Sequence, residues 1–197
     1  MNKKRRTIYL CLLLAVLTAV AVGIVICRLN MPHVLGKYEK ADMSGYSALT
    51  GEDTVFRDMS IRDLVWEMDA GSTFVVVFSH SKCPWCNAVL PVLNALGTEE
   101  AIPIGYVNTR KKPEWHSNTA MEDYDLLVQV LGEYFPLDEL DRPHLYVPHV
   151  FFIRKGEVVF EYAGAVPDYD GSGAPLTVEQ AGLLMGIYRE GFDLLRG

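Results

Sequence analysis

The chain has 197 residues, half of them hydrophobic, so it is long enough to bury one sizeable core. Its formal net charge is −7, but Lys3, Lys4, Arg5, Arg6 and Arg28 all flank one apolar segment, and the remainder has 13 basic against 25 acidic residues, a charge of −12. This acidic balance argues against a nucleic-acid-binding face, which would be basic.

The first feature along the chain is an apolar, uncharged run at residues 8–27. About 20 such residues cross a bilayer core, and the preceding basic residues predict an N-terminus in the cytoplasm. The prediction is a cytoplasmic tail at 1–7, a single-pass transmembrane anchor at 8–28 and a domain on the extracytoplasmic side. The alternatives are a signal peptide cleaved near 19–21, although the apolar run continues beyond it, and lipidation at Cys27, which Ile26 disfavours.

Residues 29–50 have little periodicity and are interpreted as a linker, with a short extra strand at the domain edge as the alternative. The domain itself is expected at 51–197. Its patterns predict, in chain order, a strand at 54–57, a helix from Ser60 to Gly71, a strand at 74–78, a helix from Cys83 to Gly97, a strand at 102–107, a helix at 121–135 inside a long polar connection, a strand at 146–153, a turn, a strand at 158–162 and a helix at 177–195.

The central stretch is the apolar strand at 74–78, a short polar turn, and then the sequence Cys83-Pro84-Trp85-Cys86. Pro84 fits the first turn of a helix, where its missing N–H would have no partner. Cys83 would then lie at the helix N-terminus, where unpaired N–H groups favour a thiolate, and Lys82 would act in the same direction. Cys86, one turn on, is within reach of a disulfide. The pair predicts a dithiol that cycles with a disulfide, Cys83 attacking and Cys86 resolving.

Three pieces of this sequence, in order, resemble the thioredoxin superfamily: the strand at 74–78 with its Cys-x-x-Cys, the Val147-Pro148 step before an apolar strand, and the strand-turn-strand at 152–159. The resemblance implies an α/β thioredoxin-like fold, with a central mixed sheet flanked by helices and a helical insert before the cis-proline strand. It implies that Pro148 is cis and faces the cysteines. The anchor and insert look most like anchored thioredoxin-like proteins of Gram-positive bacteria, including bacteriocin transport accessory proteins.

The chain also departs from the thioredoxin pattern. Val77 occupies the position where thioredoxins carry a buried Asp, so the base proposed to deprotonate the resolving thiol is missing. The intervening dipeptide is Pro84-Trp85, closer to the glutaredoxin style. His149, beside the cis-proline, is a candidate to take a proton from Cys86 instead.

The remaining site predictions concern the client. Trp85 is expected at an exposed rim for client peptides, with packing on the cis-Pro loop as the alternative, and Val147 is expected to pair its backbone with an extended client strand. The predicted function is thus a membrane-anchored thiol-disulfide oxidoreductase that needs no cofactor and acts on exported, cysteine-containing polypeptides with an unidentified redox partner. The alternative is a binding protein holding copper or zinc through Cys83, Cys86 and a histidine such as His80 or His149, or a secretion accessory protein without turnover.

Overall fold

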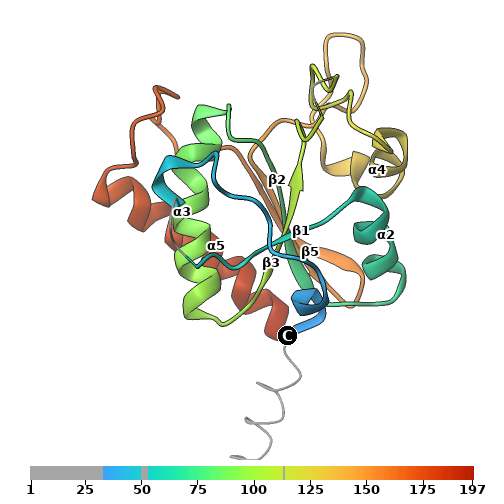
Figure 1. The fold of residues 1–197 in the computed structure, drawn as a ribbon, viewed down its shortest axis with the longest axis horizontal. Coiled ribbons are helices and arrows are strands. Elements are labelled where there is room, and N and C mark those ends of the chain that lie inside the picture. The colour runs from blue at the N-terminus through green and yellow to red at the C-terminus, as the bar shows by residue number, and fades with distance from the viewer. Residues whose placement is uncertain (1–32, 50–52, 113) are drawn as a thin grey trace, which may run out of the picture. The chain divides into compact units, whose positions relative to one another are not determined.

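The computed structural model describes residues 33–49, 53–112 and 114–197 (Figure 1). The segment predicted to cross the membrane, 8–28, lies outside these residues. Within the described part of the chain, no helix combines the length and the apolar composition needed to cross a membrane.

The core of the domain is a five-stranded mixed sheet with the strand order β1-β3-β2-β4-β5. β1 (Phe56–Asp58), β3 (Ile104–Asn108) and β2 (Phe74–Ser79) are parallel, and β4 (His149–Arg154) runs antiparallel to β2 and to β5 (Glu157–Ala163). Every residue of β2 is buried. Such a strand needs apolar side chains on both faces, which explains its unbroken Phe and Val run.

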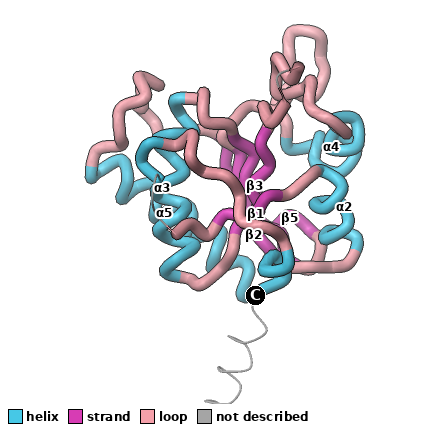
Figure 2. The backbone as a smooth tube through the Cα atoms, in the orientation of Figure 1, coloured by secondary structure: helices cyan, strands magenta, loops and turns pink. Residues whose placement is uncertain are grey.

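Helices cover both faces of this sheet (Figures 1 and 2). α2 (Ile61–Asp69) and α4 (Tyr124–Leu131) pack together on one side, and α3 (Pro84–Glu99) and α5 (Val178–Arg196) pack together on the other. The expected α/β architecture, a mixed sheet flanked by helices, is therefore confirmed.

The ends of several elements differ from the prediction. α2 starts as expected, with the Ser60 side chain and Asp63 completing a capping box. α3 runs two residues past Gly97 and passes through Pro91. The expected helix at 121–135 is shorter, because it begins at Tyr124 and tightens into a 3-10 turn at Gly132–Tyr134. Glycine is unfavourable in the interior of an α-helix, which agrees with the change from α-helix to 3-10 turn at Gly132.

The segment expected to be a linker packs on the domain over its described part, 33–49. It contains two 3-10 turns and an antiparallel bridge between Lys40 and Arg57, which resembles the alternative of a short strand at the edge. Several of its apolar side chains are buried, among them Leu35, Met43 and Tyr46. Their burial stabilises the segment on the sheet, although the residues are spaced without a regular period.

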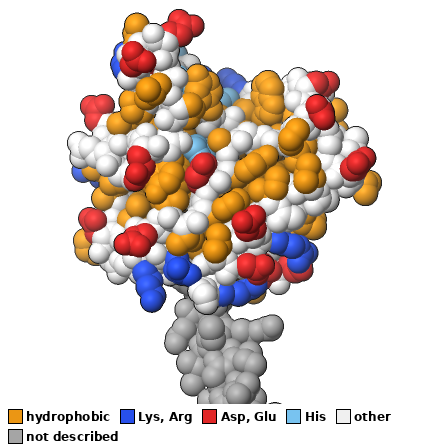
Figure 3. All heavy atoms as spheres, turned by 180° about the vertical axis from the view of Figure 1, so that it is seen from behind, with side chains coloured by type: hydrophobic (Ala, Val, Ile, Leu, Met, Phe, Trp, Pro, Cys, Tyr) orange, Lys and Arg blue, Asp and Glu red, His pale blue; other side chains and the backbone are white. Residues whose placement is uncertain are grey.

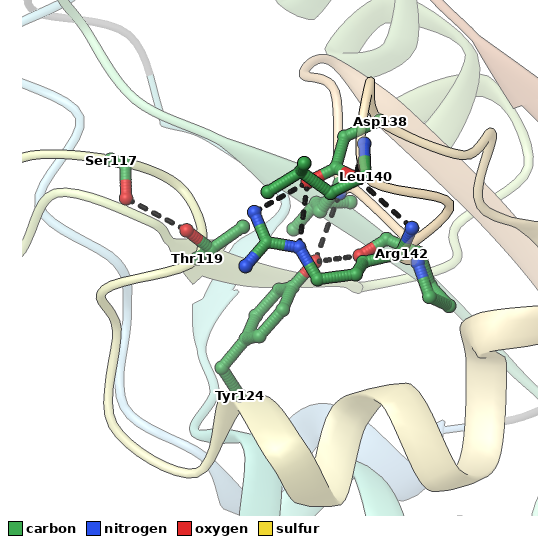
Figure 4. Close-up of polar contacts among 8 residues, drawn as sticks. Ser117, Thr119, Tyr124, Asp138, Leu140 and Arg142 are labelled. Atoms are coloured by element: carbon green, nitrogen blue, oxygen red, sulfur yellow. Dashed lines mark hydrogen bonds and ion pairs between the residues drawn. The ribbon is translucent and has the colours of Figure 1, made fainter.

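Within the insert between β3 and β4, one tyrosine of α4 ties this helix to the chain that leads into β4 (Figure 4). The Tyr124 hydroxyl donates to the Pro143 carbonyl at 3.0 Å and accepts from the Leu145 backbone N–H at 3.1 Å. A turn beside it is closed by two hydrogen bonds from the Arg142 guanidinium to one Asp138 carboxylate oxygen. The insert thereby fixes the chain just before Val147.

The surface is mixed in charge. On the face seen in Figure 3, acidic side chains lie among apolar ones over most of the area, and many of the visible Lys and Arg side chains gather near the lower edge. This distribution agrees with the acidic balance of the sequence.

Close packing between α5 and the sheet gives a test of the fold. A Cβ at Gly191 would lie 2.7 Å from the ring of Phe152, which is fully buried. We expect Gly191→Ala to lower the free energy of unfolding by about 1–3 kcal/mol because the ring must move. Gly186→Ala, in the same helix with no heavy atom within 4 Å of the new Cβ, should instead raise it by about 0.5–1 kcal/mol. Urea titration of both variants checks this, and equal effects would contradict the packing.

Candidate functional site

The two cysteines lie at the start of α3, which follows the C-terminal end of the central strand β2. Cys83 is the N-cap residue, and its sulfur accepts a hydrogen bond from the Cys86 backbone N–H at 3.3 Å. The sulfur thus takes the place of the oxygen that usually caps a helix. Pro84 occupies the first turn, as expected. Both cysteines are free thiols.

The two sulfurs are in different environments. Cys83 is 7% exposed and Cys86 is fully buried. A hydrogen bond from the Cys86 side chain, together with backbone N–H groups of Cys86 and Trp85, lowers the pKa of Cys83 to about 7 against the opposing effect of burial. Burial raises the pKa of Cys86, and the hydrogen bond and charge of Cys83 raise it further. Near neutral pH the thiolate therefore forms on Cys83, the more accessible sulfur.

The turn around Cys83 is tied to α3 by Asn87. Its side-chain amide donates to the backbone carbonyls of Ser81 at 2.7 Å and Cys83 at 2.9 Å. The Cys83 N–H in turn donates to the His80 carbonyl at 3.1 Å. These bonds hold the nucleophilic sulfur against the open end of the helix.

Pro148 lies where the resemblance predicts. The Val147–Pro148 peptide bond is cis, and the Cys83 sulfur lies 3.5 Å from the Val147 carbonyl oxygen, to which it donates. The structure thus brings together Cys83, Cys86, Val147 and Pro148.

The other predicted site residues are placed differently. Lys82 is exposed, and its charge acts on His80, whose pKa is lowered to about 4 by burial first, then by Arg110 and Lys82. Trp85 is 40% exposed, so one side is open as expected.

The other side of Trp85 packs on the loop between β5 and α5. Its ring lies 6.4 Å from that of Tyr169, in an edge-to-face arrangement. A Cβ at Gly171, where φ is +70°, would lie 2.3 Å from the Trp85 ring. The loop from β5 therefore forms one side of the site, which no sequence signal indicated.

His149 is not brought to the cysteines. Its Nε2 lies 2.5 Å from a Glu161 carboxylate oxygen, and its ring stacks on Phe151 with centroids 4.2 Å apart. Phe151 belongs to the core on the α2 and α4 side of the sheet, whereas Cys86 is on α3. Burial lowers the pKa of His149 despite the opposing effect of Glu161.

The metal-binding alternative finds no ready site in the structure. Within the described ranges, no three His, Cys, Asp or Glu side chains are grouped so that they could hold a metal ion. His149, one of the two histidines considered as a ligand, is occupied with Glu161.

Sequence reasoning missed three polar residues near Cys86: Ser79, Tyr46 and Tyr106. The hydroxyl of Tyr46 lies 2.8 Å from that of Ser79 and 3.0 Å from that of Tyr106. A hydrogen bond with the Ser79 side chain lowers the pKa of Cys86, opposite to the effect of burial. Only Ser79, which ends the strand before the motif, offered a local signal.

No protein-family model matches this chain, and no curated protein matches it. Among solved structures, it is similar to thioredoxin from Aeropyrum pernix, with 16% sequence identity and a TM-score of 0.39 over 67% of this chain and 83% of that one. This likeness is distant.

The hydrogen bond between the two side chains gives a pH prediction. In the parent protein, alkylation of Cys83 by iodoacetamide should become half-maximal near pH 7, because only the thiolate reacts. Cys86→Ala removes the side-chain donor, so the midpoint should rise by about one pH unit or more. Cys86→Ser keeps a hydroxyl donor and should shift it less. Peptide mass spectrometry at Cys83 measures each profile, and an unchanged midpoint in Cys86→Ala would refute the assignment.

Proposed function

We propose that this protein is a thiol-disulfide oxidoreductase of thioredoxin-like architecture that exchanges disulfides with cysteine-containing polypeptides. The observation that carries the proposal is the asymmetry of the pair: Cys83 caps α3 with its pKa lowered to about 7, while the pKa of the buried Cys86 is raised. In this proposal the Cys83 sulfur is the attacking nucleophile, and the Cys86 sulfur resolves the mixed disulfide.

The chemistry follows from this asymmetry. The Cys83 thiolate attacks one sulfur of a client disulfide, and the other client sulfur leaves with the electron pair and takes up a proton. The mixed disulfide is then resolved when Cys86 attacks the Cys83 sulfur, which closes the Cys83–Cys86 disulfide and releases the client as a thiol. The client gains two electrons and the enzyme loses two. The reverse sequence oxidises a client dithiol, and the reduction potential of the couple decides the direction.

The surroundings of Cys83 support an extended polypeptide as the client. Val147 lies beside the Cys83 sulfur at the cis-proline step, where its backbone can pair with an added strand. The partly exposed Trp85 adds an apolar surface next to it. The five-strand mixed sheet with a cysteine helix on one face also fits a thioredoxin-like protein.

Trapping tests this function. Cys86→Ser keeps the attacking sulfur without the resolving one, so it should accumulate mixed disulfides with an unfolded, disulfide-containing client. Cys83→Ser should accumulate about tenfold less, because the remaining thiol is buried and its pKa is raised. Non-reducing gels followed by mass spectrometry measure both. Equal trapping by the two variants would show that the assignment of attacker and resolver is wrong.

The same preparations test the alternative. The parent protein should accelerate the reduction of insulin disulfides by dithiothreitol. Neither Cys83→Ser nor Cys86→Ser should accelerate it. Elemental analysis serves as the matched control. Stoichiometric copper or zinc in the parent, with no acceleration, would instead support a metal-binding protein.

We also propose that the domain works outside the cytoplasm, held by the apolar run at 8–27. The support is the length of that run and the basic residues before it. Protease added to intact cells should remove the domain, and it should fail to do so if the cells are kept with an inhibitor. Protection of the whole chain without inhibitor would contradict this location.

A further inference from the structure

Three buried hydroxyl groups form a connected chain beneath the resolving cysteine. The hydroxyl of Tyr46 lies 2.8 Å from the hydroxyl of Ser79 and 3.0 Å from that of Tyr106. Ser79 is fully buried, and both tyrosines are 2% exposed. We call Tyr106, Tyr46 and Ser79 the hydroxyl chain. Its members come from three separate segments, so its assembly is a property of the fold.

The hydroxyl chain lies on the same face of the sheet as Cys86. Side chains alternate along β2, and Phe74, Val76 and Phe78 belong to the core on the α2 and α4 side. Ser79 therefore points to the opposite face, covered by α3, where its hydroxyl is near enough to Cys86 to lower the pKa of that thiol. Val77 shares that face but carries no polar atom.

Groups from several elements face the Cys86 thiol. The Cys83 thiol on α3, the Ser79 hydroxyl at the end of β2 and the His80 backbone just after β2 affect its pKa directly. The hydroxyls of Tyr46, of Tyr106 on β3 and of Tyr188 on α5 feel the charge of Cys86, but that of Tyr188 makes no hydrogen bond among the described residues. This set contains no carboxylate to accept a proton and no ammonium or guanidinium to stabilise an anion. Hydroxyl donors are what remains for a developing thiolate.

We propose that the hydroxyl chain stabilises the Cys86 thiolate in the resolving step, by donation from Tyr106 to Tyr46, from Tyr46 to Ser79 and from Ser79 to the sulfur. This rests on the proposed function, because a resolving step must exist. Either partner in the two oxygen–oxygen bonds can be the donor, so the donors can all turn toward the sulfur. In such a chain each donated bond strengthens the next. Tyr46 and Tyr106 are positioning residues because they act through Ser79, which is the member of the chain that reaches the reacting sulfur, and none of the three gives up its own proton.

The step balances without any added reactant. Cys86 gives up its proton and its sulfur attacks the Cys83 sulfur. The Cys83–Cys86 bond forms as the bond from Cys83 to the client breaks. The client sulfur leaves with the electron pair and takes up a proton, so the net proton transfer is from the Cys86 thiol to the client thiol. The hydroxyl chain lowers the free energy of the anion between these two events.

A two-phase thiol assay separates this role from the attack by Cys83. The full chain, in detergent and with Cys11 and Cys27 replaced by Ala, is reduced and mixed with the aromatic disulfide 5,5′-dithiobis(2-nitrobenzoate). Attack by Cys83 releases a first coloured thiolate, and attack by Cys86 releases a second. In Ser79→Ala the second phase should slow about tenfold, because a hydrogen bond to a charged group is lost, while the first stays within about twofold. The rate of the second phase in Ser79→Ala should also reach half of its maximum at a higher pH than in the parent protein.

Two further variants make the test specific. Tyr46→Phe keeps the ring and removes the middle hydroxyl, so it should slow the second phase about threefold. The matched control is Tyr188→Phe: Tyr188 is a fully buried tyrosine near Cys86 whose hydroxyl has no hydrogen-bond partner in the described structure. Its second phase should match that of the parent.

Each outcome decides something. Unchanged second phases in Ser79→Ala and Tyr46→Phe, with a normal first phase, would overturn the hydroxyl chain and leave the proposed function standing. Equal slowing in Tyr188→Phe would also overturn it, because the effect would then be one of packing. A parent protein that releases no second thiolate would overturn the proposed function, and the role of the hydroxyl chain with it.

Discussion

The site depends on the hydrogen bond that Cys86 gives to Cys83 at the first turn of α3. This bond is the largest cause of the lowered pKa of Cys83 and one cause of the raised pKa of Cys86. One contact thus separates two chemically identical side chains into a nucleophile and a reserve thiol. It requires the helix to start at Pro84, so that the two sulfurs are one turn apart and the Cys86 N–H points back at the Cys83 sulfur.

The second requirement is the burial of Cys86, which comes from the packing of α3 on the sheet. α3 packs on the sheet beside α5, and Cys86 on its inner side is fully buried, while Cys83, at the helix end, is slightly exposed. The insert contributes from the other side. Tyr124 ties the chain at Pro143 and Leu145, which leads directly into the cis step at Val147. The insert therefore fixes the position of the backbone that faces Cys83.

Local patterns in the sequence predicted the parts of this arrangement that local forces decide. The apolar strand before the motif, the proline-started helix and the helix start at Ser60 all depend on neighbours within a few residues, and all were confirmed. The cis bond followed from the resemblance and is present. Side-chain contacts between segments far apart in the sequence could not be predicted. Tyr46 sits in a stretch without periodicity, and the contact of His149 with Glu161 depends on the register of β4 and β5.

Val77 gives the last link between sequence and chemistry. A buried carboxylate at that position would cost free energy to desolvate, but it could accept the proton of the resolving thiol. The hydroxyl chain reverses both properties: its groups are neutral and satisfied by one another, so burying them costs little, yet they have no site for an extra proton. Proton removal from Cys86 is then coupled to the departing client sulfur instead of to a resident base. In the proposed exchange, the raised pKa of Cys86 therefore keeps the resolving thiol protonated until a mixed disulfide has formed on Cys83.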